Sequence, residues 1–302
     1  MGGFLYWWQH LPENMDPVLF SLGPMKVQWY GLMYIIAFAV TYFVARRRCL
    51  REDRFKAYDD EFLKNILTYG FIGVLAGGRL GYVLFYNLPY YLDHPLEIII
   101  PFSFNGGFHF TGISGMSYHG GAIGAIVGSY VFCRRYKVDF WNICDLFFPS
   151  APLGYTFGRL GNFINGELWG RVTTASVGMY FPLAPNGDLL RHPSQLYEAF
   201  FEGIFIFVVF LFLRKLRLPK GSTFAFYVFG YGFVRFFIEF YREPDKHLGF
   251  VLFGKFSRGQ ELCALMMLFG IGLLIYLWKT QPMVPPPSEA PQPASKAPQP
   301  AK

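Results

Sequence analysis

The chain has 302 residues, of which 53% are hydrophobic and only 16% are charged, and its mean hydropathy is +0.28. A soluble globular domain carries roughly 25% charged residues, so this composition excludes an ordinary soluble protein and predicts an all-α integral membrane protein. The formal net charge of +7 would suit a nucleic-acid partner. In a membrane protein, basic loops that follow the positive-inside rule account for it, and we expect no nucleic acid to bind.

Cysteine and histidine positions give no sign of a bound metal. The four cysteines are scattered without a C-x-x-C pair, and the histidines stand apart from one another. A disulfide framework or a metal site needs closer spacing. No serine stands in a G-x-S-x-G setting, which gives a covalent hydrolase little support. The sequence therefore predicts no metal and no cofactor.

Residues 1–26 are aromatic and contain proline, and they lack the basic region and apolar core of a cleavable signal peptide. We expect them at the membrane interface. Seven apolar stretches follow, each close to the ~20 residues that a helix needs to cross a bilayer. They cover about residues 27–45, 62–86, 114–133, 140–157, 195–213, 223–240 and 260–278.

Positive charges set the expected orientation of these stretches. Arg and Lys cluster directly after the first, third and fifth stretches, so these ends should face the cytoplasm. The pattern predicts a seven-transmembrane-helix bundle with its N-terminus outside and its C-terminus in the cytoplasm. The loop after the sixth stretch does not fit, because it places Arg242, Lys246, Lys255 and Arg258 outside. Either the count is wrong by one there, or these cations have a role that outweighs the rule.

We expect one transmembrane domain over residues 1–280, with external segments at about 87–114 and 159–194. Residues 281–302 are rich in Pro, Ala and Gln. Such a composition cannot form a packed core, so we expect a disordered cytoplasmic tail.

Two glycine ladders mark the second and third stretches. Small residues that recur every four positions let two helix backbones approach closely, so each ladder predicts a helix-packing face. The ladders consist of Gly73, Gly77 and Gly81, and of Gly120, Gly124 and Gly128.

Residues 158–171 combine two Arg, two Asn, one Glu and four Gly directly after an apolar run. The glycines permit backbone that is neither helix nor strand. At membrane depth such backbone is tolerated only where protein or a water-filled cavity surrounds it. We therefore expect this segment to form a site for an anionic ligand at the membrane interface.

Polar side chains from six of the stretches are expected at one depth, in the outer half of the membrane. Charges inside spanning helices are unfavourable and usually functional, and the planar donors of Arg suit phosphate. The set therefore predicts a site for a phospholipid head group, although each Arg taken singly is equally well explained by a structural role. The residues are Tyr30, Arg79, His119, Arg159, Asn162, His192, Gln195, Glu198, Arg235 and Glu239.

Several of these charges have a structural alternative. Arg235 is able to pair with Glu239, which follows it by four residues on one helix face, or with Glu198 of the preceding stretch. Arg79 would reach the membrane surface by snorkelling. Asp145 lies near the inner side and is interpreted as a helix-start or packing carboxylate.

His119 is the histidine that lies well inside an apolar stretch, and two glycines follow it. An imidazole with an ordinary pKa of ~6.5 suits proton transfer near neutral pH. The alternative is a histidine held by a neighbouring backbone carbonyl.

Six motifs together resemble the prolipoprotein diacylglyceryl transferases of bacterial inner membranes. They span nearly the whole chain; residues 104–111 read as a loop of variable length, and the Pro-rich tail falls outside. The motifs lie at residues 29–32, 77–82, 116–121, 158–167, 191–198 and 231–245.

The resemblance implies a reaction and its partners. Such a transferase moves the diacylglyceryl group of phosphatidylglycerol to the lipobox cysteine thiol of a prolipoprotein. The product is a thioether, and glycerol 1-phosphate leaves; this is the first step of bacterial lipoprotein maturation. The resemblance also implies a multi-pass protein of the inner membrane with a periplasmic N-terminus, and we expect a monomer.

The resemblance assigns roles to residues as well. Arg159 and Arg235 would hold the phosphate, and His119 would accept the thiol proton. In an alternative, Arg235 lowers the pKa of the thiol while Glu198, Glu202 or Glu239 orients it. The expected phosphatidylglycerol-binding residues are Tyr30, Arg159, Asn162, Glu167, Gly170, Tyr231, Arg235 and Glu239.

Two other classes of protein remain as alternatives. A lipid carrier would use the same arginines to move a head group, but carriers often show internal repeats and midplane sites, and no repeat is visible here. A scaffold that binds anionic lipid is the other alternative. Neither explains a histidine beside the cluster, and both would leave phosphatidylglycerol intact.

Overall fold

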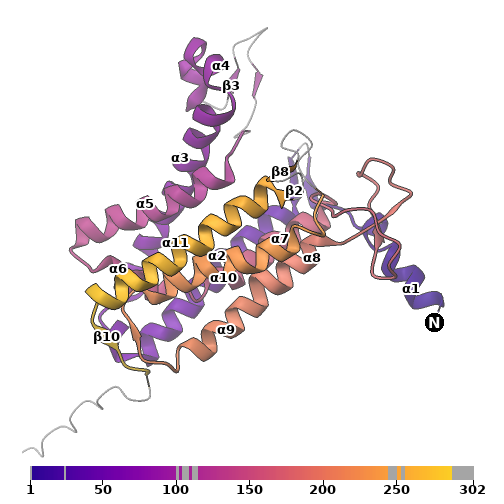
Figure 1. The fold of residues 1–302 in the computed structure, drawn as a ribbon. Helices are drawn as coiled ribbons and strands as arrows, with labels where there is room; N and C mark the ends of the chain where they lie inside the picture. The colour runs from indigo at the N-terminus through magenta and orange to yellow at the C-terminus, as the bar shows by residue number, and fades with distance from the viewer. Residues whose placement is uncertain are drawn as a thin grey trace, which may run out of the picture. The chain divides into compact units, whose positions relative to one another are not determined.

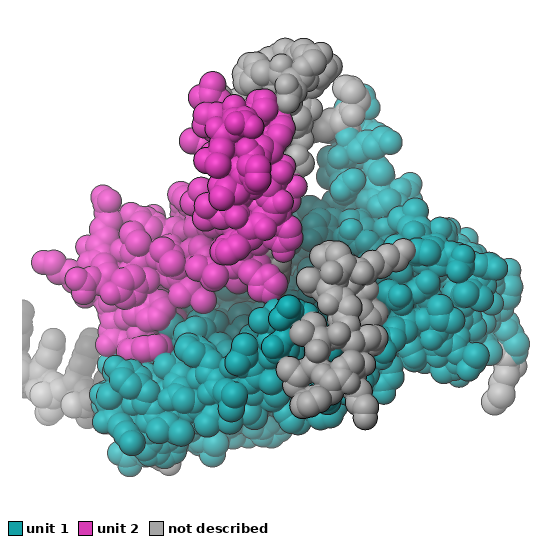
Figure 2. Space-filling model, turned by 45° about the horizontal axis from the view of Figure 1, so that its top comes forward, with its two compact units in different colours: residues 1–56, 144–302 teal, residues 57–143 magenta. Residues whose placement is uncertain are grey.

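The structure is a computed structural model that describes residues 2–23, 25–99, 102–103, 109–110, 115–243, 250–252 and 256–287. It is mostly helical, as predicted, with short two-stranded sheets between the helices (Figure 1). The chain divides into two compact units (Figure 2). Unit 1 holds residues 1–56 and 144–302, and unit 2 holds residues 57–143.

Unit 1 begins with the short helix α1 (Gly2–Gln9) and a hairpin of β1 (Val18–Leu22) and β2 (Met25–Gln28), which leads directly into α2 (Trp29–Arg51). Further along the chain, α2 packs on α7, α7 packs on η4, and α10 packs on α11. The remaining elements are η1 (Pro12–Asn14), η2 (Asp53–Phe55), α7 (Ala151–Ile164), β5 (Met179–Tyr180), β6 (Leu190–Arg191), α8 (Ser194–Tyr197), the π-helix η4 (Glu198–Phe205), α9 (Ile206–Leu213), β7 (Leu218–Pro219), α10 (Ser222–Ile238), β8 (Phe250–Leu252), β9 (Phe256–Ser257), α11 (Arg258–Thr280) and β10 (Met283–Val284). Helix α6 (Phe140–Phe147) crosses the boundary between the units.

Unit 2 is built around α3 (Asp60–Tyr86) and α5 (Tyr118–Tyr136). The Asp59 carboxylate accepts from the Phe62 amide, and the Ser117 hydroxyl accepts from the Gly120 amide, so a side chain caps the start of each helix. The other elements are α4 (Leu88–Asp93), η3 (Pro95–Ile98), β3 (Phe102–Ser103) and β4 (His109–Phe110).

The two glycine ladders face each other between α3 and α5, which confirms the predicted packing faces. A Cβ on Gly73 would overlap the backbone of Gly124, and a Cβ on Gly77 would overlap the backbone of Gly120. The helices are therefore in direct backbone contact, which no larger residue at these positions permits.

Within the described residues, four helical segments are long and apolar enough to cross a membrane: α2, α3, the continuous segment Ser194–Leu213 and α11. Helix α10 is apolar but shorter. Each of the seven predicted stretches contains a helical segment, although residues 27 and 28 belong to β2 and residue 114 lies outside the described residues. The helical class is thus confirmed, while the number of membrane crossings and their orientation remain predictions.

The fourth predicted stretch differs from the prediction in two ways: it is interrupted in the middle, and its second helix extends beyond residue 157. It is broken between α6 and α7, because Pro149 cannot continue α6 and Pro152 stands in the first turn of α7. Helix α7 then continues to Ile164, so residues 159–164 are helical and are not part of an irregular external segment. Irregular backbone starts only at Gly166 and Leu168, which have φ values of 66° and 60°.

The expected tail is ordered at its beginning. Met283 and Val284 of β10 pair with Pro219 and Leu218 of β7, and the Lys220 amide donates to Pro282. The first residues of the predicted tail are therefore paired with unit 1, and residues 288–302 lie outside the described residues. Most of the loop at 104–111 lies outside them too.

Candidate active site

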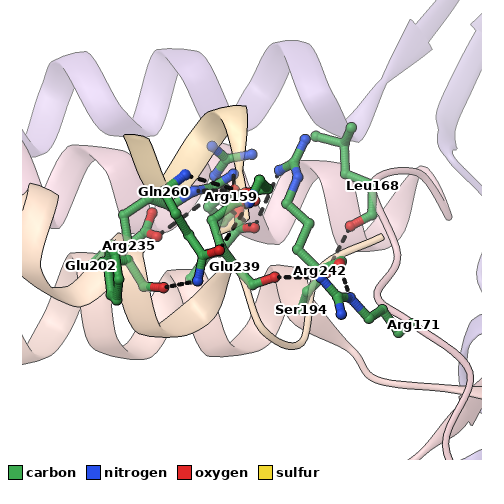
Figure 3. A network of polar contacts seen from close by, with 12 residues as sticks. Arg159, Leu168, Arg171, Ser194, Glu202, Arg235, Glu239, Arg242 and Gln260 are labelled. Carbon is green, nitrogen blue, oxygen red and sulfur yellow. Dashed lines mark hydrogen bonds and ion pairs between the residues drawn. The ribbon is translucent and has the colours of Figure 1, made fainter. Parts of the chain in front are cut away.

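Glu198 lies at the centre of a buried ionic network in unit 1. Its side chain is 0% exposed, and it forms ion pairs with three arginines, which Figure 3 labels together with Glu202 and Glu239. Arg159 Nε lies 2.8 Å from Glu198 Oε2, Arg235 Nη1 lies 3.0 Å from Oε1, and Arg242 Nη1 lies 3.3 Å from Oε1. One carboxylate therefore holds arginines from α7, from α10 and from the residues just after α10.

The carboxylates of three glutamates surround Arg235. Its Nη2 lies 2.8 Å from Glu239 Oε1, and its Nη1 contacts Glu198 Oε1 at 3.0 Å and Glu202 Oε1 at 3.5 Å. Both pairings left open by the sequence are thus present at once. Because every nitrogen of this guanidinium faces a carboxylate, Arg235 is the most fully engaged arginine of the network.

Tyr155 connects the two sides of the network. Its hydroxyl oxygen accepts a hydrogen bond of 2.6 Å from Arg159 Nε and donates to Glu202. The Arg159 guanidinium also lies over the Tyr155 ring, 4.7 Å from its centroid, and this ring meets Tyr231 edge-on at 5.7 Å. Tyr155 was missed in the sequence, although it precedes Arg159 by four residues and therefore shares its helix face.

Two of the arginines keep unused donors. Within the described residues, Arg159 uses Nε and Nη1, and no acceptor engages its Nη2. Arg242 likewise uses Nη1, and neither its Nε nor its Nη2 has an acceptor among the same residues. The network thus presents unpaired guanidinium donors beside Glu198, which suit an oxyanion such as phosphate.

The segment after α7 extends the network. Arg159 Nη1 donates to Asn162 Oδ1 at 3.4 Å, and Asn162 Nδ2 donates to Glu167 Oε1 at 2.8 Å. On the neighbouring α2, the Tyr30 ring packs against α7 where Gly161 leaves room, since a Cβ there would come within 2.8 Å of Tyr30 Cδ2. The sequence prediction grouped these residues with Arg159, and the structure places them together.

Gly170 fills a backbone position that admits no side chain. Its amide donates to the backbone carbonyl oxygen of His192 at 2.8 Å, and a Cβ at this position would overlap the backbone carbonyl oxygen of Tyr241. Next to it, Arg171 Nε donates to Arg242 O at 2.8 Å. These contacts fasten the segment between α7 and α8 to the end of α10, directly beside the arginines.

The start of α11 supports Glu239. The Ser257 hydroxyl donates to Glu239 Oε2 at 3.1 Å, and a Cβ on Gly259 would come within 2.8 Å of the same carboxyl group. Ser257 and Gln260 also form a capping box at this helix end. The carboxylate thus lies where the helix dipole favours negative charge.

The remaining predicted polar residues are not members of the Glu198 network. His192 and Gln195 lie beside the network: His192 contacts the Tyr197 hydroxyl at 3.1 Å, and Gln195 Nε2 donates to Glu167 O at 2.6 Å. Arg79 and His119 belong to unit 2. There Arg79 donates to Ile98 O at 2.8 Å, and His119 is exposed in the first turn of α5.

Two of the four cations that disturbed the expected orientation have partners. Arg242 pairs with Glu198, and Arg258 pairs with Glu261 at 3.1 Å. Lys246 and Lys255 lie outside the described residues. Arg242 thus takes part in the buried network, while the count of crossings and the side of the membrane on which this loop lies remain predictions.

The fold and this network define a multi-pass helical membrane protein with a buried network of arginines and glutamates. Comparison with known proteins specifies the family. The sequence profile described as "Prolipoprotein diacylglyceryl transferase" matches residues 17–276. The chain belongs to the prolipoprotein diacylglyceryl transferase family, which confirms the resemblance seen in its motifs.

Three relatives illustrate this similarity, and each is named a phosphatidylglycerol–prolipoprotein diacylglyceryl transferase. The protein of Chlorobaculum tepidum is 54% identical over 277 residues, which cover 91% of this chain and 94% of the relative. That of Campylobacter lari is 42% identical over 272 residues, covering 89% and 96%. That of Oleidesulfovibrio alaskensis is 44% identical over 267 residues, covering 88% and 94%.

Proposed function

We propose that this chain transfers the diacylglyceryl group of phosphatidylglycerol to the lipobox cysteine of a prolipoprotein, in the inner membrane of a bacterium. The observation that carries the proposal is the set of unpaired donors of Arg159 and Arg242 around Glu198. A carrier for the same lipid would also have to bind the head group. It would not need an environment that stabilises charge developing on a leaving group.

The reaction exchanges one bond of the glyceryl carbon for another. The cysteine sulfur forms a bond to the carbon that carries the phosphate, and the bond from this carbon to the phosphate oxygen breaks. The electron pair remains on that oxygen, so glycerol 1-phosphate leaves with one more negative charge than the diester had. The thiol proton passes to a base, and the product is a thioether.

We assign the phosphate to Arg159, as the resemblance implies, and to Arg242 in place of Arg235, because the donors of Arg235 already face three glutamates. Donors aimed at the oxygen on which charge develops stabilise the transition state, because they act in a water-poor site. Arg235, held by three glutamates, fixes the position of Glu198, Glu202 and Glu239 relative to the other two arginines. Asn162 accepts a hydrogen bond from Arg159 and donates one to Glu167, so these two residues help to hold Arg159 in place.

A base is needed because a cysteine thiol with an ordinary pKa of ~8.5 is mostly protonated at neutral pH. His119 remains our candidate for this role. In the alternative, Arg235 lowers the pKa of the thiol, and the glutamates of the network orient it.

We also propose the architecture expected from the sequence. Seven segments cross the membrane, α6 and α7 together form one crossing, and the N-terminus is periplasmic. Residues 1–280 act as one catalytic domain, and the protein works as a monomer. Under this orientation, the buried network lies toward the periplasmic side, where a secreted prolipoprotein presents its lipobox cysteine.

The test uses the purified full-length protein in lipid nanodiscs with phosphatidylglycerol and a lipobox peptide, and it measures release of glycerol phosphate. We expect Arg159→Ala and Arg242→Ala to lower kcat by about 100-fold or more, as the loss of an oxyanion-stabilising donor does. Arg258→Ala is the matched control, because this arginine is 49% exposed and pairs only at the surface.

His119→Gln separates the two accounts of the base. A collapse of the rate at neutral pH that is partly restored at higher pH supports His119, and an unchanged rate assigns the role elsewhere. If folded wild-type protein binds phosphatidylglycerol but releases no glycerol phosphate, the transferase proposal fails and the carrier takes its place.

A further inference from the structure

The first part of helix α1, residues 2–7, is exposed on every side. Residues 2–9 carry no charge. Phe4, Tyr6 and Trp7 are 71%, 66% and 55% exposed, and Leu5 is exposed as well. These consecutive residues point in different directions around the helix, so no face of its first part is turned into the protein. A helix that is hydrophobic all round belongs in a core or in lipid.

The other end of α1 is firmly held. The Trp8 indole N–H donates to Val177 O at 3.1 Å, and the His10 ring lies 4.7 Å from the Tyr180 ring. Trp8 and Leu11 also pack on the buried cluster formed by Phe163, Met179, Phe181 and Ala184. The helix is thus fixed to the segment that follows α7 and cannot fold back to cover its own apolar side chains.

The position of α1 in unit 1 points to the membrane surface. The hairpin after it continues without a break into α2, a segment able to cross a membrane. Figure 1 shows α1 at the end of unit 1 where β2 and α8 lie, to one side of the long helices. Ile35 in the second turn of α2 is 67% exposed, so apolar surface continues onto that spanning helix.

We propose that α1 lies in the interfacial layer of the lipid bilayer and buries Phe4 and Trp7 among the lipids. Eight residues of helix extend only about 12 Å, which is too short to cross. Trp and Tyr favour the region between head groups and acyl chains. The occupant of this surface is lipid rather than protein, because residues 2–9 carry no charge and the exposed apolar side chains precede a helix that is able to cross a membrane.

Helix α1 precedes residues 17–276, which the family profile matches. Its contact with lipid has a consequence for the site. Through Trp8, α1 holds the segment after α7, and this segment carries Glu167 and Arg171. An α1 embedded at the surface therefore fixes that segment at the level of the lipid head groups.

The experiment places one fluorophore at a time on an introduced cysteine. The four native cysteines are buried, so a maleimide dye reacts with the new position, and unmodified protein serves as the blank. The positions are Phe4→Cys, Val208→Cys on α9 as a lipid-facing control, and Asp188→Cys, an exposed charged position, as a water-facing control. Each labelled protein is reconstituted in nanodiscs whose lipids carry a quencher near the head group or deep in the chain.

We expect the dye at position 4 to show blue-shifted emission and at least twofold stronger quenching by the shallow than by the deep quencher. The dye at 208 should show the reverse order, and the dye at 188 little quenching by either. Quenching at position 4 as weak as at 188 would overturn the proposal. A blue shift at position 4 that disappears in nanodiscs holding a single protein copy would also overturn the proposal, because a second copy would then cover α1. The same holds for a blue shift that requires the lipobox peptide, because the peptide would then cover it.

Discussion

At the scale of the residue, Glu198 is the most consequential side chain in the described structure. It is fully buried and neutralises parts of three arginines that would otherwise repel one another. Removal of one member of a buried ionic group is strongly destabilising, because the partners keep their desolvated charge.

Glu198→Gln should therefore lower the free energy of unfolding by about 3–5 kcal/mol. The matched control is Glu261→Gln, whose partner Arg258 is at the surface and whose effect should stay below about 1 kcal/mol. Denaturant unfolding in detergent micelles measures both. Equal stability of the two variants would show that the network is not energetically coupled as the contacts indicate.

Tyr155 allows a test of positioning without loss of packing. Tyr155→Phe keeps the ring against Tyr231 and removes the hydroxyl between Arg159 and Glu202. A hydrogen bond to a charged group contributes about 1.5–3 kcal/mol, so we expect kcat to fall about 10- to 100-fold with little change in KM. Tyr276→Phe, at an exposed position of α11, is the control. A change in KM alone would instead place Tyr155 in lipid binding.

At the scale of the element, the packing of α3 on α5 rests on glycines in backbone contact. Gly124→Ala places a methyl group against the carbonyl of Gly73, and overpacking of this kind costs about 1–3 kcal/mol or more. Gly121→Ala is the control on the same helix, since its Cβ would meet Val74 at an ordinary 3.6 Å. Thermal unfolding should separate the two variants, and a Gly124→Ala protein as stable as the control would contradict the described packing.

The π-helix η4 sets the position of Glu198 and Glu202 relative to α7. Thr156 of α7 lies against Gly203, and its hydroxyl oxygen is 3.1 Å from the carbonyl oxygen of Ala199. A π-turn is often found at functional sites. Here it lets two helices approach at one glycine.

Gly203→Ala should push η4 from α7 and separate Arg159 from Glu198, so we expect transfer activity to drop at least 10-fold. Thr156→Gly in the same chain removes the clashing atoms and should restore much of the rate. Failure of this second substitution to rescue activity would mean that Gly203 acts through another neighbour.

The sequence predicted the positions of the helices better than the breaks between them and the residues at which they end. Apolar runs and glycine spacing located the helices and the α3–α5 contact, because both signals are local. Pro149 and Pro152 carried the information for the break between α6 and α7, but the run was treated as one span. The extension of α7 to Ile164 was missed because glycine permits irregular backbone without requiring it.

The sequence named most of the charged residues of the network, but it did not show how these residues pair, and it missed Tyr155. Spacing alone placed Arg235 within reach of Glu239, but the choice between Glu239 and Glu198 depends on how α10 packs against η4. The same limit hid Tyr155, whose role arises only when Glu202 of another helix meets its hydroxyl.

At the scale of the whole molecule, unit 1 carries a second polar network, at the opposite ends of its helices. Asp145 accepts hydrogen bonds from Arg54 at 2.6 Å, from the Gly221 amide at 2.8 Å and from the Thr223 hydroxyl at 2.9 Å. It ties α6 to the start of α10, as the prediction of a packing carboxylate requires.

The two networks should respond differently to mutation. Asp145→Asn should reduce the yield of folded protein and leave kcat per folded molecule nearly unchanged. Arg159→Ala should lower kcat per folded molecule by about 100-fold or more. Size-exclusion profiles measured with glycerol phosphate release distinguish these outcomes, and a lowered kcat in well-folded Asp145→Asn protein would assign this end of the unit a part in the reaction.

Glu198 has a further consequence for turnover. It is an anion already in place where Arg159, Arg235 and Arg242 meet, so a phosphate that binds the unused donors of Arg159 and Arg242 shares these arginines with it and is repelled by its negative charge. The arginines are never left facing an empty apolar site between cycles. We therefore expect Glu198 to keep the dwell time of the phosphate product short, which makes it an internal competitor that clears the site for the next lipid.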